Sequence, residues 1–154
     1  MEKLSLFVLA AAAALGVSAA NVPADHWSTT DGTTYSDGVW TVKLDNQSRF
    51  DGIAAYDDGA GNAGPWTLDL SKPFVNASGK EVKIKSIYKA RNGLSTTDAA
   101  CLEEIKLPTY PEFTAISKDF TEFSALKRFV PMFPAGVSVT GMMPASLEGE
   151  VTIS

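Results

Sequence analysis

The sequence predicts a mainly β protein with short helices, in which a β-rich N-terminal cap over residues 21–65 precedes a short solenoid of parallel strands over residues 66–154. Turn-forming Asp-Gly pairs separate alternating apolar stretches in the first half, and a leucine-headed strand pattern recurs in the second. The 154-residue chain is 45% hydrophobic and 20% charged, which is typical of one small globular or repeat domain. A small β-sandwich is the alternative, because short strands separated by turns also build that fold.

The first twenty residues have the composition of a cleaved secretory signal peptide. Lys3 precedes an uncharged run from Leu4 to Val17, and small residues follow at the positions that a signal peptidase recognises. We expect cleavage after Ala19 or Ala20. A run of 14 residues is short for a membrane span, which needs roughly 20. The sequence therefore predicts a secreted or cell-surface protein without stable membrane insertion.

Strands and tight turns alternate over residues 21–65. Glycine tolerates positive φ and aspartate hydrogen-bonds the neighbouring backbone, so four Asp-Gly pairs predict turns that begin at Asp31, Asp37, Asp51 and Asp58. The stretch WTVKL at 40–44 alternates apolar and polar residues, which predicts a half-buried strand, and WTLDL at 66–70 repeats the pattern. Residues 88–100 are compatible with either a short helix or an irregular loop.

The stretch LEEIKLP at 102–108 predicts a strand whose apolar side chains face the core. Pro108 ends this strand because proline lacks the N–H group that a ladder requires. Further apolar residues follow at spacings of four, three and three, which predicts one face of a short helix. These residues are Ile116, Phe120, Phe123 and Leu126.

The strand pattern returns at Leu126 and at Leu147, which gives units of 24 residues (102 to 126) and 21 residues (126 to 147). Periods of 20–29 residues with one short strand per unit are typical of leucine-rich solenoids. One such unit cannot bury its apolar face alone, whereas stacked units bury a continuous column. The chain stops at Ser154, directly after the last predicted strand. We therefore expect a truncated repeat array or edge-strand association at this end, unless the repeat does not extend to Leu147.

The stretch from Leu102 to Phe129 resembles the BspA-like class of leucine-rich repeats from bacterial surface proteins, most clearly over residues 102–133. A unit of that class has an Ile, a short helical turn with an aromatic residue, and then Leu-x-x-Ile-x-Ile/Leu-Pro. The matching residues are Leu102, Ile105, Leu107, Pro108, Ile116, Phe120, Leu126 and Phe129. The sequence departs from the pattern in three places. Pro131 occupies the inward position after Phe129, where the pattern has an aliphatic residue. In the last unit Val151 and Ile153 come one residue late, and the unit at 66–101 is longer than the others.

The resemblance implies a non-enzymatic binding or adhesion protein whose partner is a protein or a surface glycan. The candidate contact residues are expected on the outside of neighbouring strands, and they are Glu103, Glu104, Lys106, Lys127 and Arg128. The alternative is a carbohydrate-binding module in the aromatic, Asp/Gly-rich N-terminal half. That half contains Trp27 and Trp40 and leads into Trp66, although the strand pattern turns two of the three tryptophans inward.

The composition argues against catalysis, cofactors and nucleic acid. A net charge of −5 gives no electrostatic reason to expect a nucleic-acid partner. His26 is the only histidine and Cys101 the only cysteine, which argues against a His-based triad or a zinc site and excludes an intrachain disulfide. Glu103 and Glu104 are adjacent, so we expect them to point to opposite sides of a strand and not to form a catalytic acid pair.

One loop remains open to a second interpretation. Asp51, Asp57, Asp58 and Asn62 crowd the segment before residue 65, and calcium takes oxygen ligands from such loops. Their spacing does not match a D-x-[DN]-x-[DN]-G loop, and these residue types are also ordinary turn formers. We predict solvated turns and no metal here, with calcium as the alternative.

Overall fold

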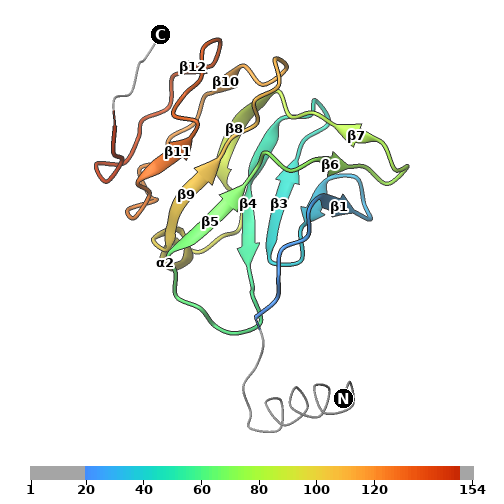
Figure 1. The fold of residues 1–154 in the computed structure, drawn as a ribbon, viewed down its shortest axis with the longest axis horizontal. Helices are drawn as coiled ribbons and strands as arrows, with labels where there is room; N and C mark the ends of the chain where they lie inside the picture. The colour runs from blue at the N-terminus through green and yellow to red at the C-terminus, as the bar shows by residue number, and fades with distance from the viewer. Residues whose placement is uncertain (1–19, 150–154) are drawn as a thin grey trace, which may run out of the picture.

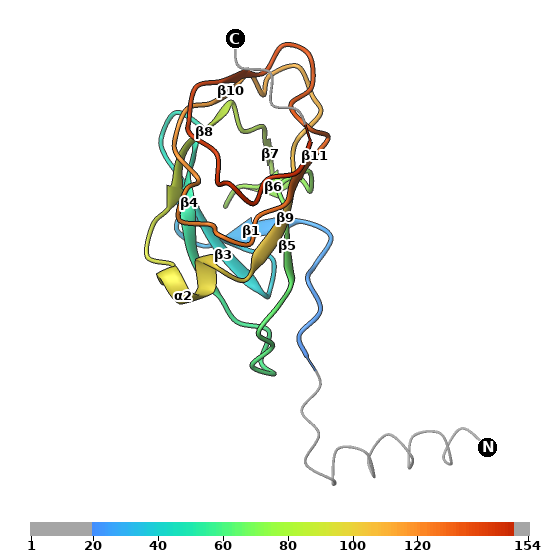
Figure 2. The same ribbon diagram turned by 90° about the vertical axis from the view of Figure 1, so that its left-hand side faces the viewer.

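The computed structural model describes residues 20–149, which form two β-sheets that face each other across one hydrophobic core (Figures 1 and 2). Sheet A contains β1 (Trp27–Thr29), β2 (Thr34–Ser36), β3 (Trp40–Leu44), β4 (Phe50–Tyr56), β6 (Phe74–Val75), β7 (Glu81–Val82), β8 (Ser86–Arg91), β10 (Ala115–Ile116) and β12 (Ser138–Val139). Sheet B contains β5 (Trp66–Asp69), β9 (Leu102–Lys106) and β11 (Arg128–Val130). The strand order is β12-β10-β8-β4-β3-β2-β1-β6-β7 in sheet A and β11-β9-β5 in sheet B.

The fold is mainly β, as the sequence predicts. The predicted signal peptide, apart from Ala20, lies outside the described residues, as do Val151 and Ile153.

The first four strands form an antiparallel meander that supplies one half of sheet A. Asp31 Oδ1 accepts hydrogen bonds from two backbone N–H groups that follow it, at 2.9 and 2.7 Å, and Gly32 has a φ of +83°. Asp37 Oδ1 accepts two similar hydrogen bonds, at 3.0 and 2.7 Å, between β2 and β3. The first two Asp-Gly pairs therefore form the turns that the sequence predicts, whereas Asp51 and Gly52 lie within β4, so the turn predicted there is wrong.

A buried ion pair joins this meander to the next part of the chain. Lys72 Nζ lies 2.6 Å from Asp37 Oδ2, and the side chains are 14% and 1% exposed. Lys72 Nζ also donates to the carbonyl of Ala24 at 2.9 Å. Just beyond Lys72, β6 pairs in parallel with β1 and forms an antiparallel hairpin with β7. This hairpin accounts for the extra length of the unit at 66–101, and it extends sheet A beyond the meander.

The remaining strands alternate between the two sheets. β4, β8, β10 and β12 pair in parallel in sheet A, whereas β5, β9 and β11 pair in parallel in sheet B. Along the chain β4 leads to β5, β8 to β9 and β10 to β11, so each passage around the core, called a coil below, adds one strand to each sheet (Figure 2). The predicted parallel strands are therefore present, and β11 lies beside β9.

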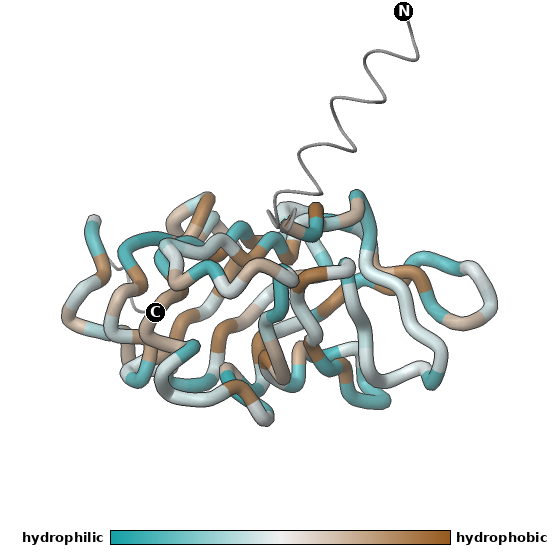
Figure 3. Tube along the Cα trace, turned by 90° about the horizontal axis from the view of Figure 1, so that it is seen from below, coloured by the Kyte–Doolittle hydropathy of each residue, from teal (hydrophilic) through white to brown (hydrophobic). Residues whose placement is uncertain are grey.

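Apolar residues at matching positions of successive strands form the core between the sheets. Figure 3 shows hydrophobic positions recurring along the chain trace. Cross-strand partners in sheet A are the buried residues Phe50, Ile87, Ile116 and Val139. The corresponding buried partners in sheet B are Leu68, Ile105 and Phe129. Because the same position of each strand faces inward, one apolar column continues from coil to coil.

Backbone hydrogen bonds align the leucines that begin the repeated pattern. The N–H of Lys127 donates to the carbonyl of Glu103 at 2.8 Å, and the N–H of Glu148 donates to the carbonyl of Lys127 at 2.7 Å. The bonded residues, Glu103, Lys127 and Glu148, are separated by 24 and 21 residues, the same spacings as between the leucines that precede them. Leu102, Leu126 and Leu147 therefore occupy neighbouring positions. The first two are buried and Leu147 is half-buried against the core.

Residues 116–126 do not form the predicted helix. Two successive turns follow β10, closed by hydrogen bonds from the N–H of Phe123 to the carbonyl of Phe120 and from the N–H of Leu126 to the carbonyl of Phe123, each 3.0 Å long. Each turn advances the chain by three residues, so these apolar side chains all face the core, as one face of a helix would. The only helix among residues 20–149 is α2 (Thr96–Ala99), where Ser95 is the N-cap.

Candidate functional site

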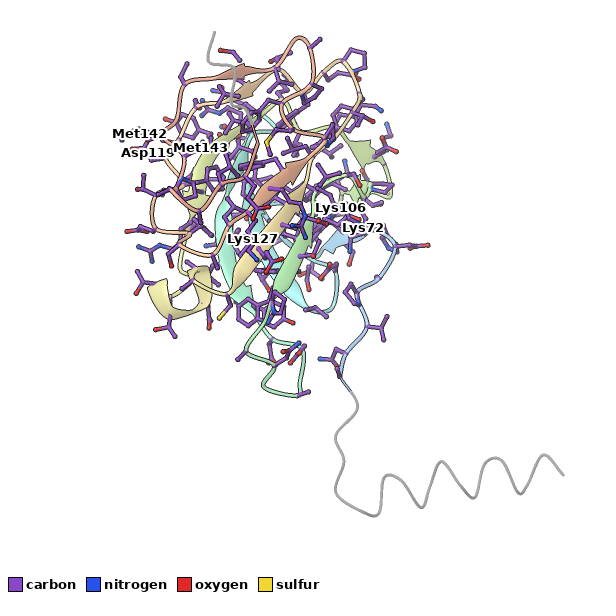
Figure 4. All side chains as sticks on the ribbon, turned by 60° about the vertical axis from the view of Figure 1, so that its left-hand side comes forward. Lys72, Lys106, Asp119, Lys127, Met142 and Met143 are labelled. Atoms are coloured by element: carbon purple, nitrogen blue, oxygen red, sulfur yellow. The ribbon has the colours of Figure 1, made fainter. Side chains whose placement is uncertain are left out.

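The five predicted contact residues lie together on the outer side of sheet B. Glu103, Glu104 and Lys106 belong to β9, whereas Arg128 begins β11, the parallel neighbour of β9, and Lys127 directly precedes it. Figure 4 shows Lys106 and Lys127 over the same side of the sheet. We refer to these five residues as the charged face.

Ion pairs connect the two strands of the charged face. Arg128 Nε donates to Glu104 Oε2 at 2.6 Å, and Arg128 Nη2 lies 3.4 Å from Glu103 Oε1. Lys127 Nζ lies 3.7 Å from Glu103 Oε2. The hydrogen bond to Glu104, together with the nearby carboxylates, raises the pKa of the Arg128 guanidinium. Such partly exposed pairs add little to stability, but they favour one arrangement of the side chains.

Glu103 and Glu104 point to the same side of sheet B, so the prediction that they point apart is wrong. Both side chains reach Arg128, and the inward neighbours Leu102 and Ile105 lie on either side of the pair. The register between β5 and β9 shifts just after Trp66, and an irregularity of this kind turns two consecutive residues outward. Both carboxylates contact Arg128, whereas Lys127 pairs with Glu103 alone.

All three tryptophans belong to the core. Trp27, Trp40 and Trp66 are 0%, 2% and 5% exposed. Each indole N–H donates to a backbone carbonyl, at 3.0, 2.9 and 3.0 Å respectively. The inward positions predicted for Trp40 and Trp66 are confirmed, and within residues 20–149 no tryptophan offers an exposed ring for stacking against a sugar.

A cavity of about 290 Å³ lies between the loop after β4 and the segment that contains α2. Its lining residues are Tyr56, Asp57, Asp58, Gly61, Asn62, Ala63, Trp66, Thr97, Asp98 and Cys101. Three of the four residues proposed for the calcium alternative therefore come together here, whereas Asp51 lies on β4 and is not part of the lining. In the part of the chain that the structure describes, no group of three or more His, Cys, Asp or Glu residues is arranged to hold a metal ion.

The single histidine and the single cysteine lie next to strands of different sheets. His26 is exposed just before β1, where its Nδ1 lies 2.8 Å from the carboxylate of Asp25. Cys101 is half-buried just before β9, with its Sγ 3.5 Å from the carbonyl of Thr97. Sequence reasoning identified Asp57, Asp58 and Asn62 but missed the contribution of α2 and Cys101 to the same cavity, because no motif links the two segments.

No helix between residues 20 and 149 is both long enough and apolar enough to cross a membrane. Comparison of the chain with family models, with curated proteins and with solved structures gives no match. The function is therefore inferred from the charged face and the cavity.

Proposed function

We propose that this protein is a secreted or cell-surface binding protein of the leucine-rich-repeat type, without enzymatic activity, that contacts a protein partner through the charged face. Three observations support the proposal. Parallel strands alternate between sheets A and B, the leucine spacings of 24 and 21 residues coincide with backbone hydrogen bonds between successive coils, and residues 102–133 resemble BspA-like repeats. The signal-like composition of residues 1–20 supports export.

The charged face is the observation that supports a contact surface most directly. Four of its five residues stand on the paired strands β9 and β11, and the N–H of Lys127 donates to the carbonyl of Glu103, so the backbone fixes their relative positions. Val130, which is 42% exposed, is the cross-strand partner of Lys106 and adds an apolar contact beside the charges. A partner with complementary charges would exchange these internal ion pairs for intermolecular ones, which favours specificity and a high association rate over raw affinity.

The test is binding of the purified protein to immobilised extracellular-matrix proteins and to immobilised glycans, measured by biolayer interferometry. We expect the Lys127→Glu/Arg128→Glu variant to bind a protein on that panel about tenfold more weakly than the wild type. The matched control is Lys85→Glu/Lys89→Glu, which makes the same charge change at two exposed residues, Lys89 on β8 and Lys85 directly before that strand. Equal binding by both variants and the wild type would contradict the proposal.

Carbohydrate binding stays a hypothesis. A sugar would have to enter the cavity beside Tyr56 and Trp66, since the indoles themselves are buried. The same panel tests this alternative. Glycans that bind the wild type and both charge variants equally, with no protein bound, would favour it.

A further inference from the structure

We propose that the cavity between the loop after β4 and α2 binds a protonated amine, carried either by a small molecule or by a lysine side chain. Its volume of about 290 Å³ equals the space of roughly ten water molecules, enough for an alkylammonium group. Its lining combines two aromatic rings with three carboxylates and includes no lysine, arginine or histidine. This inference is independent of the role proposed for the charged face.

Two stacked rings form the aromatic side of the cavity. The ring centroids of Tyr56 and Trp66 are 3.7 Å apart, with an interplanar angle of 16°. Trp40 packs edge-on against both rings, at centroid distances of 4.7 and 5.8 Å, which holds them in place. Each ring covers one face of the other and Trp66 is 5% exposed, so the half-buried Tyr56 provides most of the aromatic surface that a ligand in the cavity can contact.

Carboxylates provide the negative charge of the cavity. Asp58 is only 5% exposed, yet its Oδ1 accepts a hydrogen bond from the N–H of Ala60 at 2.9 Å and its Oδ2 lies 3.3 Å from the Tyr56 hydroxyl. The hydrogen bond from Ala60 is the main cause of the lowered pKa of Asp58, so this buried carboxyl stays charged. Burial and the neighbouring Asp58 raise the pKa of Tyr56 to about 12, so the phenol stays neutral.

Asp57 and Asp98 add two further acidic groups to the lining, one from each side of the cavity. A cleft lined by a single sign of charge concentrates the electric field and raises the local concentration of the opposite charge. A neutral sugar would gain hydrogen bonds there but no such electrostatic attraction, and an anion would be repelled. The charge of the lining therefore selects a cation over the other ligand classes.

The loop that forms one wall is held against the start of β9. The backbone N–H of Trp66 donates to the carbonyl of Cys101 at 2.9 Å, and the indole N–H of Trp66 donates to the carbonyl of Asn62 at 3.0 Å. Gly64 has a φ of +102°, and a Cβ at this position would lie 3.0 Å from the carbonyl oxygen of Cys101. These contacts preform the cavity, which reduces the entropy cost of binding.

The three indole N–H resonances provide the test, in a two-dimensional ¹H–¹⁵N NMR titration of the purified protein. We expect butylammonium chloride to shift the Trp66 resonance while the Trp27 resonance, from the other sheet, stays fixed. A second titration with N-acetyl-lysine amide distinguishes the sources. Tighter binding of this probe indicates a lysine side chain as the natural ligand, whereas tighter binding of butylammonium indicates a small amine.

Charge variants with a matched control complete the design. Asp57→Asn and Asp98→Asn should each weaken butylammonium binding about fivefold, whereas Asp51→Asn, outside the lining, should leave it unchanged. An unchanged Trp27 resonance shows that each variant is folded. The proposal is overturned if the Trp66 resonance does not move at about 50 mM amine, a concentration well above a millimolar dissociation constant. It is also overturned if glucose shifts that resonance at the same concentrations, or if all three variants bind equally.

Discussion

Gly141→Ala is expected to separate the last two coils, because Gly141 lies where their backbones touch. A Cβ on Gly141 would overlap the carbonyl group of Lys118, which is backbone and cannot rotate away. Four hydrogen bonds cross this contact, and Figure 4 shows Asp119 close to Met142 there. The N–H groups of Thr140 and Gly141 both donate to the carbonyl of Ile116, at 3.0 and 3.4 Å. The N–H of Met142 donates to Asp119 Oδ1 at 2.8 Å, and the N–H of Phe120 donates to the carbonyl of Met142 at 2.8 Å.

The expected cost follows from these contacts. A net value of about 1 kcal/mol per hydrogen bond, with two or three bonds broken, gives a loss of about 3 kcal/mol in the free energy of unfolding. For a domain of this size that corresponds to a fall of about 10 °C in Tm. Chemical denaturation followed by tryptophan fluorescence measures the loss directly. The control is Met142→Ala, because the Met142 side chain is 65% exposed and its removal should cost less than about 0.5 kcal/mol. A Gly141→Ala variant within about 1 kcal/mol of the wild type would refute the close approach of the coils.

Two further predictions concern the core and the tyrosines. Ile116→Ala should lower the free energy of unfolding by about 3 kcal/mol, because Ile116 is fully buried between cross-strand partners on both sides, and urea denaturation would show this as a lower midpoint with an unchanged slope. Burial raises the pKa of both Tyr56 and Tyr110 to about 12. Since their pKa in the unfolded chain is about 10, the stability that they contribute is fully present below pH 10 and is lost as the pH rises from 10 towards 12. Tyrosinate absorbance at 295 nm should show late-titrating groups, and Tyr56→Phe should remove one of them. A single titration near pH 10 would contradict their burial.

Inward-facing positions could be predicted from the sequence because buried positions of a strand carry apolar residues at regular spacing. Leu102, Ile105 and Leu107 are buried as predicted, and the spacing from Leu102 to Leu126 coincides with the pairing of β9 and β11. The local backbone conformation was harder to predict. The spacing at 116–126 fits a helix face and a series of three-residue turns equally well, and the turns were found.

The cavity could not be predicted, for a different reason. Asp58 and Asp98 meet only because β5 pairs with β9, which brings the loop before β5 against the segment before β9. Pairing between strands that are 36 residues apart (Trp66 to Leu102) depends on the whole fold and leaves no local signal. The outward turn of both Glu103 and Glu104 depends on the same pairing, since the register shift arises between β5 and β9.

The Asp37–Lys72 ion pair joins the first half of the chain to the second. A fragment without the first half would lack both Asp37 and Ala24, which supply the carboxylate and the carbonyl that Lys72 Nζ contacts. The same truncation would remove β1, to which β6 pairs, and β4, to which β8 pairs. A fragment that begins at Trp66 is therefore not expected to fold alone. Limited proteolysis should accordingly degrade the chain from end to end without leaving a stable fragment of either half.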